Sequence, residues 1–272
     1  MATDGEIITS FGNATIKLAR SLADRKARRE HGVFFAEGLE MLERAKAGGY
    51  RIRQLFIAEN AAFEARVAPL RAWAEASEAR VAHVAPPVMA KLSAMSNPPP
   101  VAALLEPKPA ALPNVTQVTS EDTWVVLEEL RDPGNLGTII RTADAAGARG
   151  VILVGDCADP YAPEAVRAST GSVFAVPVAT ASVEAFAQWA AEWPGLILGS
   201  AATGAADYHG AAGRHPVLLL IGSEANGLSA RLTGLCHRLA RIPMAGTAES
   251  LNAAIATALL LYAVRRPFLE KK

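Results

Sequence analysis

The chain has few cysteines and no excess of charge of either sign. Cys157 and Cys236 are its only cysteines in 272 residues, and they lie outside any CxxC spacing. This excludes a disulfide scaffold and a cysteine-rich zinc module, and it favours a reducing, cytoplasmic location. Lysine plus arginine and aspartate plus glutamate both number 27, so the formal net charge is zero. A polycationic protein of the histone type is therefore excluded, although a local basic face is not.

Long apolar runs and the common catalytic motifs are also missing. The longest apolar run, within residues 251–264, holds about 14 residues, fewer than the ~20 that a membrane helix needs. The N-terminal residues do not contain a basic segment followed by an apolar one, so we expect no signal peptide. No P-loop, GxGxxG after a strand, GxSxG or HExxH is present. The five histidines have no metal-ligand spacing, so we expect neither a metal site nor a membrane partner.

Prolines divide the chain into two parts. Six of the 17 prolines fall between residues 98 and 113, and proline resists helix formation. We therefore predict a semi-rigid linker over residues 98–114, in which residues 101–105 pair at most as an edge strand. The linker separates a domain of residues 1–97 from a domain of residues 115–272. Short strands alternate with helices in both, which predicts two α/β domains.

The C-terminal domain contains unbroken apolar strands at residues 124–127, 151–154, 196–198 and 217–221. Such strands, separated by helices, indicate a mostly parallel sheet with helices on both faces. Ligands of open parallel sheets bind just beyond the carboxyl ends of the strands. The segments that follow these strands are therefore where we look for chemistry.

Two of these segments follow strands directly. In the first, an Asp-Pro-Gly-Asn turn containing Asn135 opens a helix, and its free N–H groups suit an anion. Arg141 follows within two helical turns and can clamp a phosphate. The second segment brackets Glu224 with glycines, and Gly222 would let a ligand approach the backbone. An ordinary βα turn and a tight turn before a helix remain the alternative interpretations.

The third segment is a long loop that leads into an apolar helix through Ser250 and Asn252. The helix is almost wholly apolar, so we expect it to be buried in the core or in a dimer interface. Burying Asn252 in the first turn of that helix would require hydrogen-bond partners. Asn252 is therefore a candidate functional residue.

A basic segment in the N-terminal domain points to RNA. Residues 13–29 are predicted to form one helix, and residues 17–30 carry six basic and two acidic side chains. Charge gathered on one helix is typical of phosphate contacts. The candidate RNA contacts are Lys17, Arg25, Lys26 and Arg28. A solvated helix face would give the same pattern.

Taken together and in order, the three C-terminal segments resemble the three motifs of the SpoU/TrmH family of RNA ribose 2′-O-methyltransferases, in the SPOUT superfamily. The matching strings are Asp-Pro-Gly-Asn-Leu-Gly with Arg141, Ile-Gly-Ser-Glu-Ala-Asn-Gly-Leu-Ser, and Ile-Pro-Met-Ala-Gly followed by Ser-Leu-Asn. The resemblance covers residues 120–268. The N-terminal domain is similar to the RNA-binding domain of the same family.

The resemblance implies a C-terminal segment threaded into a trefoil knot, a rare exception to unknotted topology. It implies S-adenosylmethionine as the cofactor, a homodimer, and an active site drawn from both subunits. By position, the residues implied in cofactor binding are Gly222, Ile242, Met244 and Leu251.

The resemblance also implies roles for the catalytic candidates. Arg141 would bind the phosphate and ribose of the target nucleotide, Glu224 and Asn252 would orient that network, and Asn135 would fix the first turn. Many members have a hydroxyl residue shortly after the asparagine, where this chain has Ala253-Ala254. If that hydroxyl assists the chemistry, its role in this chain is either vacant or passes to Ser250.

The expected substrate is ribosomal RNA, with 23S rRNA favoured and tRNA as the alternative. Two other functions remain open at this point. One is a non-catalytic RNA-binding protein on the same fold, and the other is a small-molecule enzyme that uses the Gly222 loop for a nucleotide cofactor. The sequence leaves open which nucleotide is modified and which group accepts the 2′-hydroxyl proton.

Overall fold

The computed structural model describes residues 7–61, 65–93, 95–201, 206–208, 215–247 and 249–269. The chain divides into two compact units. The N-terminal unit comprises Met1–Lys108 and Tyr161–Ala175, and the C-terminal unit comprises Pro109–Pro160 and Val176–Lys272. Among the described residues, no helix combines the length and apolar character of a membrane span.

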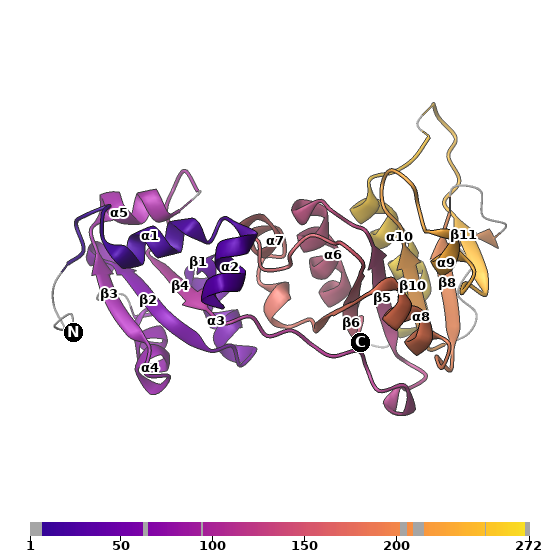
Figure 1. Ribbon diagram of the computed structural model, residues 1–272, viewed down its shortest axis with the longest axis horizontal. Coiled ribbons are helices and arrows are strands. Elements are labelled where there is room, and N and C mark those ends of the chain that lie inside the picture. The colour runs from indigo at the N-terminus through magenta and orange to yellow at the C-terminus, as the bar shows by residue number, and fades with distance from the viewer. Residues whose placement is uncertain are drawn as a thin grey trace. The chain divides into compact units, whose positions relative to one another are not determined.

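The N-terminal unit is built on a four-stranded mixed sheet of order β1-β4-β2-β3, in which only β2 and β3 are parallel. Helices α1 and α5 lie on one side of this sheet and α3 and α4 on the other (Figure 1). The strands are β1 (Phe34–Glu37), β2 (Ile52–Ala58), β3 (Arg80–Val84) and β4 (Val101–Leu105). The helices are α1 (Ala14–Ser21), α2 (Arg25–His31), α3 (Leu39–Ala47), α4 (Ala68–Ala76), α5 (Pro86–Leu92) and α7 (Pro163–Ala168), with short 3₁₀ turns η1 (Glu59–Ala61) and η3 (Ser172–Phe174).

The basic segment forms two helices instead of the single helix predicted. The first helix ends at Ser21, and Asp24 begins the second by accepting a hydrogen bond from the Lys26 N–H at 2.6 Å. A side-chain cap of this kind satisfies an N–H that has no partner within the helix. Residues 13–29 contain no proline and no glycine to mark the break before Asp24, so the sequence pattern did not reveal the corner.

Residues 101–105 do pair as a strand, but the prediction that this strand lies at an edge of the sheet is wrong. Strand β4 lies inside the sheet, between β1 and β2, and both of its neighbours are antiparallel to it. All five of its residues are buried. The prolines precede and follow the strand without interrupting it, so the extended stretch predicted as a linker contributes to the core of the N-terminal unit.

Segment 161–175 follows β6 in the chain but belongs to the N-terminal unit. The ring of Tyr161 lies 4.6 Å from that of the fully buried Phe34, and Phe174 lies 6.3 Å from the same ring. The Tyr50 hydroxyl donates to the Val173 carbonyl at 3.0 Å. The unit boundaries therefore differ from the expected ranges of 1–97, 98–114 and 115–272.

The C-terminal unit contains a seven-stranded parallel sheet of order β7-β6-β5-β10-β8-β11-β9. The strands are β5 (Thr123–Glu128), β6 (Gly150–Val154), β7 (Val178–Ala181), β8 (Leu196–Ser200), β9 (Ala206–Asp207), β10 (Val217–Ile221) and β11 (Arg238–Arg241). The helices are α6 (Pro133–Ala145), α8 (Val183–Ala190), α9 (Ala230–Thr233) and α10 (Ala253–Leu269), with a 3₁₀ turn η2 (Val115–Gln117). The α/β class and the parallel sheet agree with the prediction.

Helices cover both faces of this sheet (Figure 1). Side chains of α8 and α9 share one core with Trp124, Val126 and Leu218. Helices α6 and α10 pack against each other and against β6 and β10. Because strand side chains alternate between faces, the intervening residues, such as Val125 and Leu219, point to the opposite face from that core.

Candidate active site

Three loops converge at the carboxyl edge of the parallel sheet. They follow β5, β10 and β11, whose common direction places their ends at one edge. The amide of Asn135 donates to the Glu224 carboxylate in a very short hydrogen bond. The amide of Asn252 donates to the side-chain oxygen of Asn135 at 2.9 Å. One chain of hydrogen bonds thus joins all three loops.

Asn135 is placed by the start of helix α6. Asp132 caps this helix and accepts from the Asn135 N–H at 2.6 Å, and Pro133 occupies the first helical position. Proline suits this position because its missing N–H would have no partner there. The turn therefore fixes Asn135 at the helix N-terminus, where its amide meets Glu224 and Asn252.

Asn252 is exposed, whereas we expected it to be buried. Its side-chain oxygen accepts from the N–H groups of Ala254 and Ile255, at 2.9 and 3.3 Å. The helix begins at Ala253, so Asn252 is its cap and not part of its first turn. One oxygen satisfies the helix end, which leaves the amide nitrogen free to reach Asn135.

The apolar helix α10 is only half covered. It buries Leu260, Leu261 and Val264, as predicted for a core helix. Its other side exposes Ile255, Leu259 and Tyr262. These three residues follow one another at intervals of four and three, so they form a single stripe along the helix.

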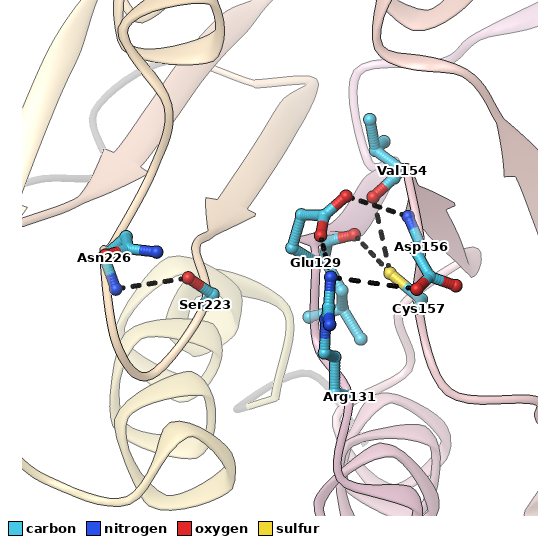
Figure 2. A network of polar contacts seen from close by, with 8 residues as sticks. Glu129, Arg131, Val154, Asp156, Cys157, Ser223 and Asn226 are labelled. Atoms are coloured by element: carbon cyan, nitrogen blue, oxygen red, sulfur yellow. Dashed lines mark hydrogen bonds and ion pairs between the residues drawn. The ribbon is translucent and has the colours of Figure 1, made fainter.

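Gly222 is required by the loop itself. A Cβ atom at this position would lie 2.0 Å from the Gly227 carbonyl carbon and 2.1 Å from the Leu228 nitrogen. Ser223 and Gly227 exchange two backbone hydrogen bonds, at 2.9 and 3.1 Å, so the loop turns back directly onto Gly222. The Ser223 hydroxyl also accepts from the Asn226 N–H at 3.2 Å (Figure 2). The need for glycine here comes from this close backbone contact, whereas we had attributed it to a ligand.

Arg141 and Ser250 do not join this hydrogen-bond chain. Arg141 is exposed on α6 and forms no hydrogen bond or ion pair with any residue in the described part of the chain. Ser250 lies two residues before Asn252, is exposed, and likewise forms no hydrogen bond among the described residues.

The residues expected to bind a cofactor lie on two of the three loops. Gly222 is buried directly after β10. Ile242 and Met244 follow β11, and Leu251 precedes Asn252. Met244 and Leu251 are exposed although they are large and apolar. Apolar side chains held open beside a polar site suit a flat, partly apolar ligand.

Two carboxylates at the end of β5 were not singled out in the sequence, and the first of them contacts the loop that carries Glu224. Glu128 accepts from the Ser229 N–H at 2.7 Å, and Glu129 accepts from the Asp156 N–H at 2.9 Å. Glu129 also pairs with Arg131 at 3.0 Å, and Figure 2 shows this group beside the Cys157 thiol. The bond from Asp156, followed by that from Arg131, lowers the pKa of Glu129. Two consecutive glutamates closing an apolar strand were the available signal in the sequence.

The four expected RNA contacts do not share one environment. Lys17, Arg25 and Lys26 are exposed on α1 and α2. Arg28 is only 5% exposed, and its guanidinium donates to the carbonyls of Leu22 and Ala23 at 2.7 and 2.9 Å. Its assignment to RNA is therefore corrected, because the guanidinium holds the end of α1. Among the described residues, no group of three or more potential metal ligands is found.

Comparison with known proteins agrees with this arrangement. Residues 122–262 match the SpoU rRNA Methylase family, and residues 13–103 match the MRM3-like substrate binding domain. A 23S rRNA (uridine(2479)-2′-O)-methyltransferase of Streptomyces viridochromogenes is 34% identical over 90% of this chain and 87% of its own length.

Two solved structures cover nearly the whole chain. An AdoMet-bound rRNA methyltransferase from Sinorhizobium meliloti has a TM-score of 0.88 and 38% identity, covering 96% of this chain and 98% of its own. The SpoU methyltransferase AviRb of Streptomyces viridochromogenes, in complex with AdoMet, has a TM-score of 0.80 and 33% identity, covering 96% of this chain and 100% of its own. On the family match and these similarities over almost its full length, the chain belongs to the SpoU rRNA methylase family.

Proposed function

We propose that this protein transfers the methyl group of S-adenosylmethionine to a ribose 2′-hydroxyl of 23S rRNA. The observation that carries the proposal is the hydrogen-bond chain from Asn252 through Asn135 to Glu224, which ties three loops into one site. A relative that matches 90% of this chain is a 23S rRNA 2′-O-methyltransferase. We also propose a cytoplasmic location, because the relative's substrate, ribosomal RNA, is found there in bacteria such as Streptomyces.

The residues at the sheet edge fit the cofactor. The exposed apolar side chains of Met244 and Leu251 suit a purine ring, and Gly222 and Ile242 offer backbone on the two loops. When bound there, the cofactor would supply a methyl group activated on a sulfonium. The protein's own contribution to an in-line displacement is to position the nucleophile against that carbon.

Arg141 is assigned to the target nucleotide. Its exposed guanidinium has no partner among the described residues, so it is available to a phosphate. Its permanent charge would stabilise the negative charge that develops as the 2′-hydroxyl attacks. We do not assign Arg141 as the base, because a guanidinium donates hydrogen bonds and has no acceptor atom. Glu224, Asn135 and Asn252 would orient the ribose, and Ser250, two residues before Asn252, would supply a hydroxyl.

We also propose a homodimer that pairs through α10. The exposed stripe of Ile255, Leu259 and Tyr262 runs along one side of a helix whose other side is buried. Covering such a stripe with a second copy removes apolar surface from water, which favours association. We further propose that the loops after β10 and β11 are threaded as a trefoil knot, and that exposed Lys17, Arg25 and Lys26 contact RNA phosphates.

The test is transfer of labelled methyl from S-adenosylmethionine to 23S rRNA and, separately, to tRNA. A 2′-O-methyl group blocks alkaline cleavage of the neighbouring phosphodiester, so label should remain in alkali-resistant dinucleotides from 23S rRNA. Label that appears only in tRNA would move the proposal to the alternative substrate. Cofactor binding without transfer to either RNA would instead favour a non-catalytic RNA-binding protein.

A further inference from the structure

Strand β5 ends in two glutamates that reach in different directions. In the sheet, β5 lies between β6 and β10. Glu128 accepts from the N–H of Ser229, at the end of the loop that follows β10. Glu129 accepts from the N–H of Asp156, in the loop that follows β6. Consecutive carboxylates thus tie the end of β5 to the loops on both of its sides.

The backbone at the strand end makes this double contact possible. Glu129 has a φ of 54°, in the left-handed region that residues other than glycine rarely adopt. This ends the regular alternation of the strand and turns Glu129 toward the β6 loop. Figure 2 shows Glu129 with Asp156 and Arg131, away from the Ser223–Asn226 turn. Within the described part of the chain, Glu128 forms a hydrogen bond to the Gly222–Ser229 loop, whereas the hydrogen bonds of Glu129 go to Asp156 and Arg131.

Glu128 is also the more buried of the two, with only 3% of its surface exposed. Burying a carboxylate is costly unless hydrogen bonds compensate for the lost water. The hydrogen bond between Glu128 and Ser229 fixes the C-terminal end of the loop that follows β10. The N-terminal end of this loop is fixed by the close contact of Gly222 with the backbone of Gly227 and Leu228. The segment between these two anchors carries Glu224, which must reach Asn135.

We propose that Glu128 is a positioning residue for methyl transfer. It acts through Ser229 by holding the Gly222–Ser229 loop in the position that binds the cofactor and brings Glu224 to Asn135. The inference rests on the proposed function, because it assumes that this loop binds S-adenosylmethionine. In this proposal, Glu128 must supply an oxygen that accepts the hydrogen bond from the Ser229 N–H. The negative charge of the side chain is less important than this acceptor.

The first test compares Glu128→Met with Glu128→Gln in the full-length protein. Methionine keeps the length of the side chain but has no oxygen, so we expect the Kd and KM for S-adenosylmethionine to rise roughly 10-fold or more. Glutamine retains an acceptor and should keep both constants within about threefold of wild type. Glu129→Gln is the matched control, because its contacts lie on the β6 loop, and it should leave both constants unchanged.

A second pair tests the same bond from its donor side and remains informative if Glu128→Met fails to fold. Ser229 has a φ of −61°, which proline can adopt, so Ser229→Pro removes the N–H. Ser229→Ala keeps the N–H but also loses the hydroxyl that caps α9, as proline does. We expect the Kd for S-adenosylmethionine to rise for proline and to stay near wild type for alanine.

Equal cofactor constants within both pairs would overturn the assignment. A fall in kcat and in the unfolding midpoint with unchanged KM would overturn it too, because that is the signature of a purely structural role. A wild-type protein that binds no S-adenosylmethionine would instead refute the proposed function, and calorimetric titration of the wild type distinguishes the two failures.

Discussion

Separate substitutions of Arg28 and Lys26 test two different roles. We expect Arg28 to stabilise the junction between α1 and α2, and Lys26 to bind an RNA phosphate. Both lie on α2, but Arg28 is buried against two carbonyls and Lys26 is exposed. Arg28→Met keeps an apolar side chain and removes both hydrogen bonds. Hydrogen bonds from a charged donor contribute about 1.5–3 kcal/mol each, so the expected loss of stability is about 3 kcal/mol or more.

A loss of that size should lower the unfolding midpoint by roughly 6–12 °C. Lys26→Ala should leave the midpoint unchanged, since an exposed lysine in a helix is replaced by a strong helix former. For RNA binding we expect the reverse: Lys26→Ala should change its salt dependence and Arg28→Met should not. Losing one phosphate contact makes the slope of log K against log salt shallower by about 0.7–0.9.

Both effects are measurable with 23S rRNA in filter binding and with thermal unfolding monitored by fluorescence. Between about 50 and 200 mM salt, the changed slope of Lys26→Ala amounts to about a threefold difference in affinity relative to wild type. Arg28→Met, measured well below its midpoint, should keep the wild-type slope. An unchanged midpoint with a shallower slope for Arg28→Met would refute the corrected role of this residue.

Three further variants or conditions follow from the structure. Gly222→Ala should destabilise the protein by about 1–3 kcal/mol and weaken cofactor binding, because the added methyl group would lie about 2 Å from backbone atoms. Gly246→Ala is the control: its methyl group would meet no atom of the described residues within 4 Å, so the variant should keep the wild-type unfolding midpoint. If the protein forms the proposed dimer through α10, Ile255→Glu should yield a monomer in light scattering, and a mass equal to that of wild type would argue against α10 as the interface. Burial, followed by the charge of Glu128, raises the pKa of Cys236 to about 11. Thiol labelling of Cys236 should therefore be slow at pH 8 and accelerate toward pH 11. Because the pKa of this thiol is higher in the folded state than in the unfolded state, where it is near 9, the free energy of unfolding should fall between about pH 9 and pH 11. Rapid labelling at pH 8 would contradict this expectation.

Much of the architecture could be predicted from local pattern. Unbroken apolar strands separated by helices indicated a parallel sheet, and the common direction of those strands brings Asn135 and Glu224 to one edge. This followed because the carboxyl ends of parallel strands share an edge whatever the order of the strands. Asn252 reaches the same edge after β11, a strand that the apolar pattern did not reveal. The roles given to these residues in methyl transfer remain predictions.

The features that could not be predicted from the sequence depend on contacts between residues that are distant in the chain. Charge pattern cannot distinguish Arg28 from its exposed neighbours, because burial is decided by how α2 folds back on α1. Local composition also marked residues 98–114 as a linker, although pairing on both sides places β4 within the sheet. Likewise, segment 161–175 belongs to the N-terminal unit through aromatic contacts with Phe34, more than a hundred residues away.

The most direct test of the proposed activity is a nucleoside analysis of 23S rRNA after incubation with S-adenosylmethionine, for wild type and Asn135→Ala side by side. Asn135 lies in the middle of the chain from Asn252 to Glu224, so its loss should disorder the site while α6 keeps its Asp132 cap. We predict one 2′-O-methylated nucleoside with wild type and a rate on the order of 100-fold lower with the variant. Methylation of a base instead of a ribose, or equal rates for the two proteins, would contradict the account.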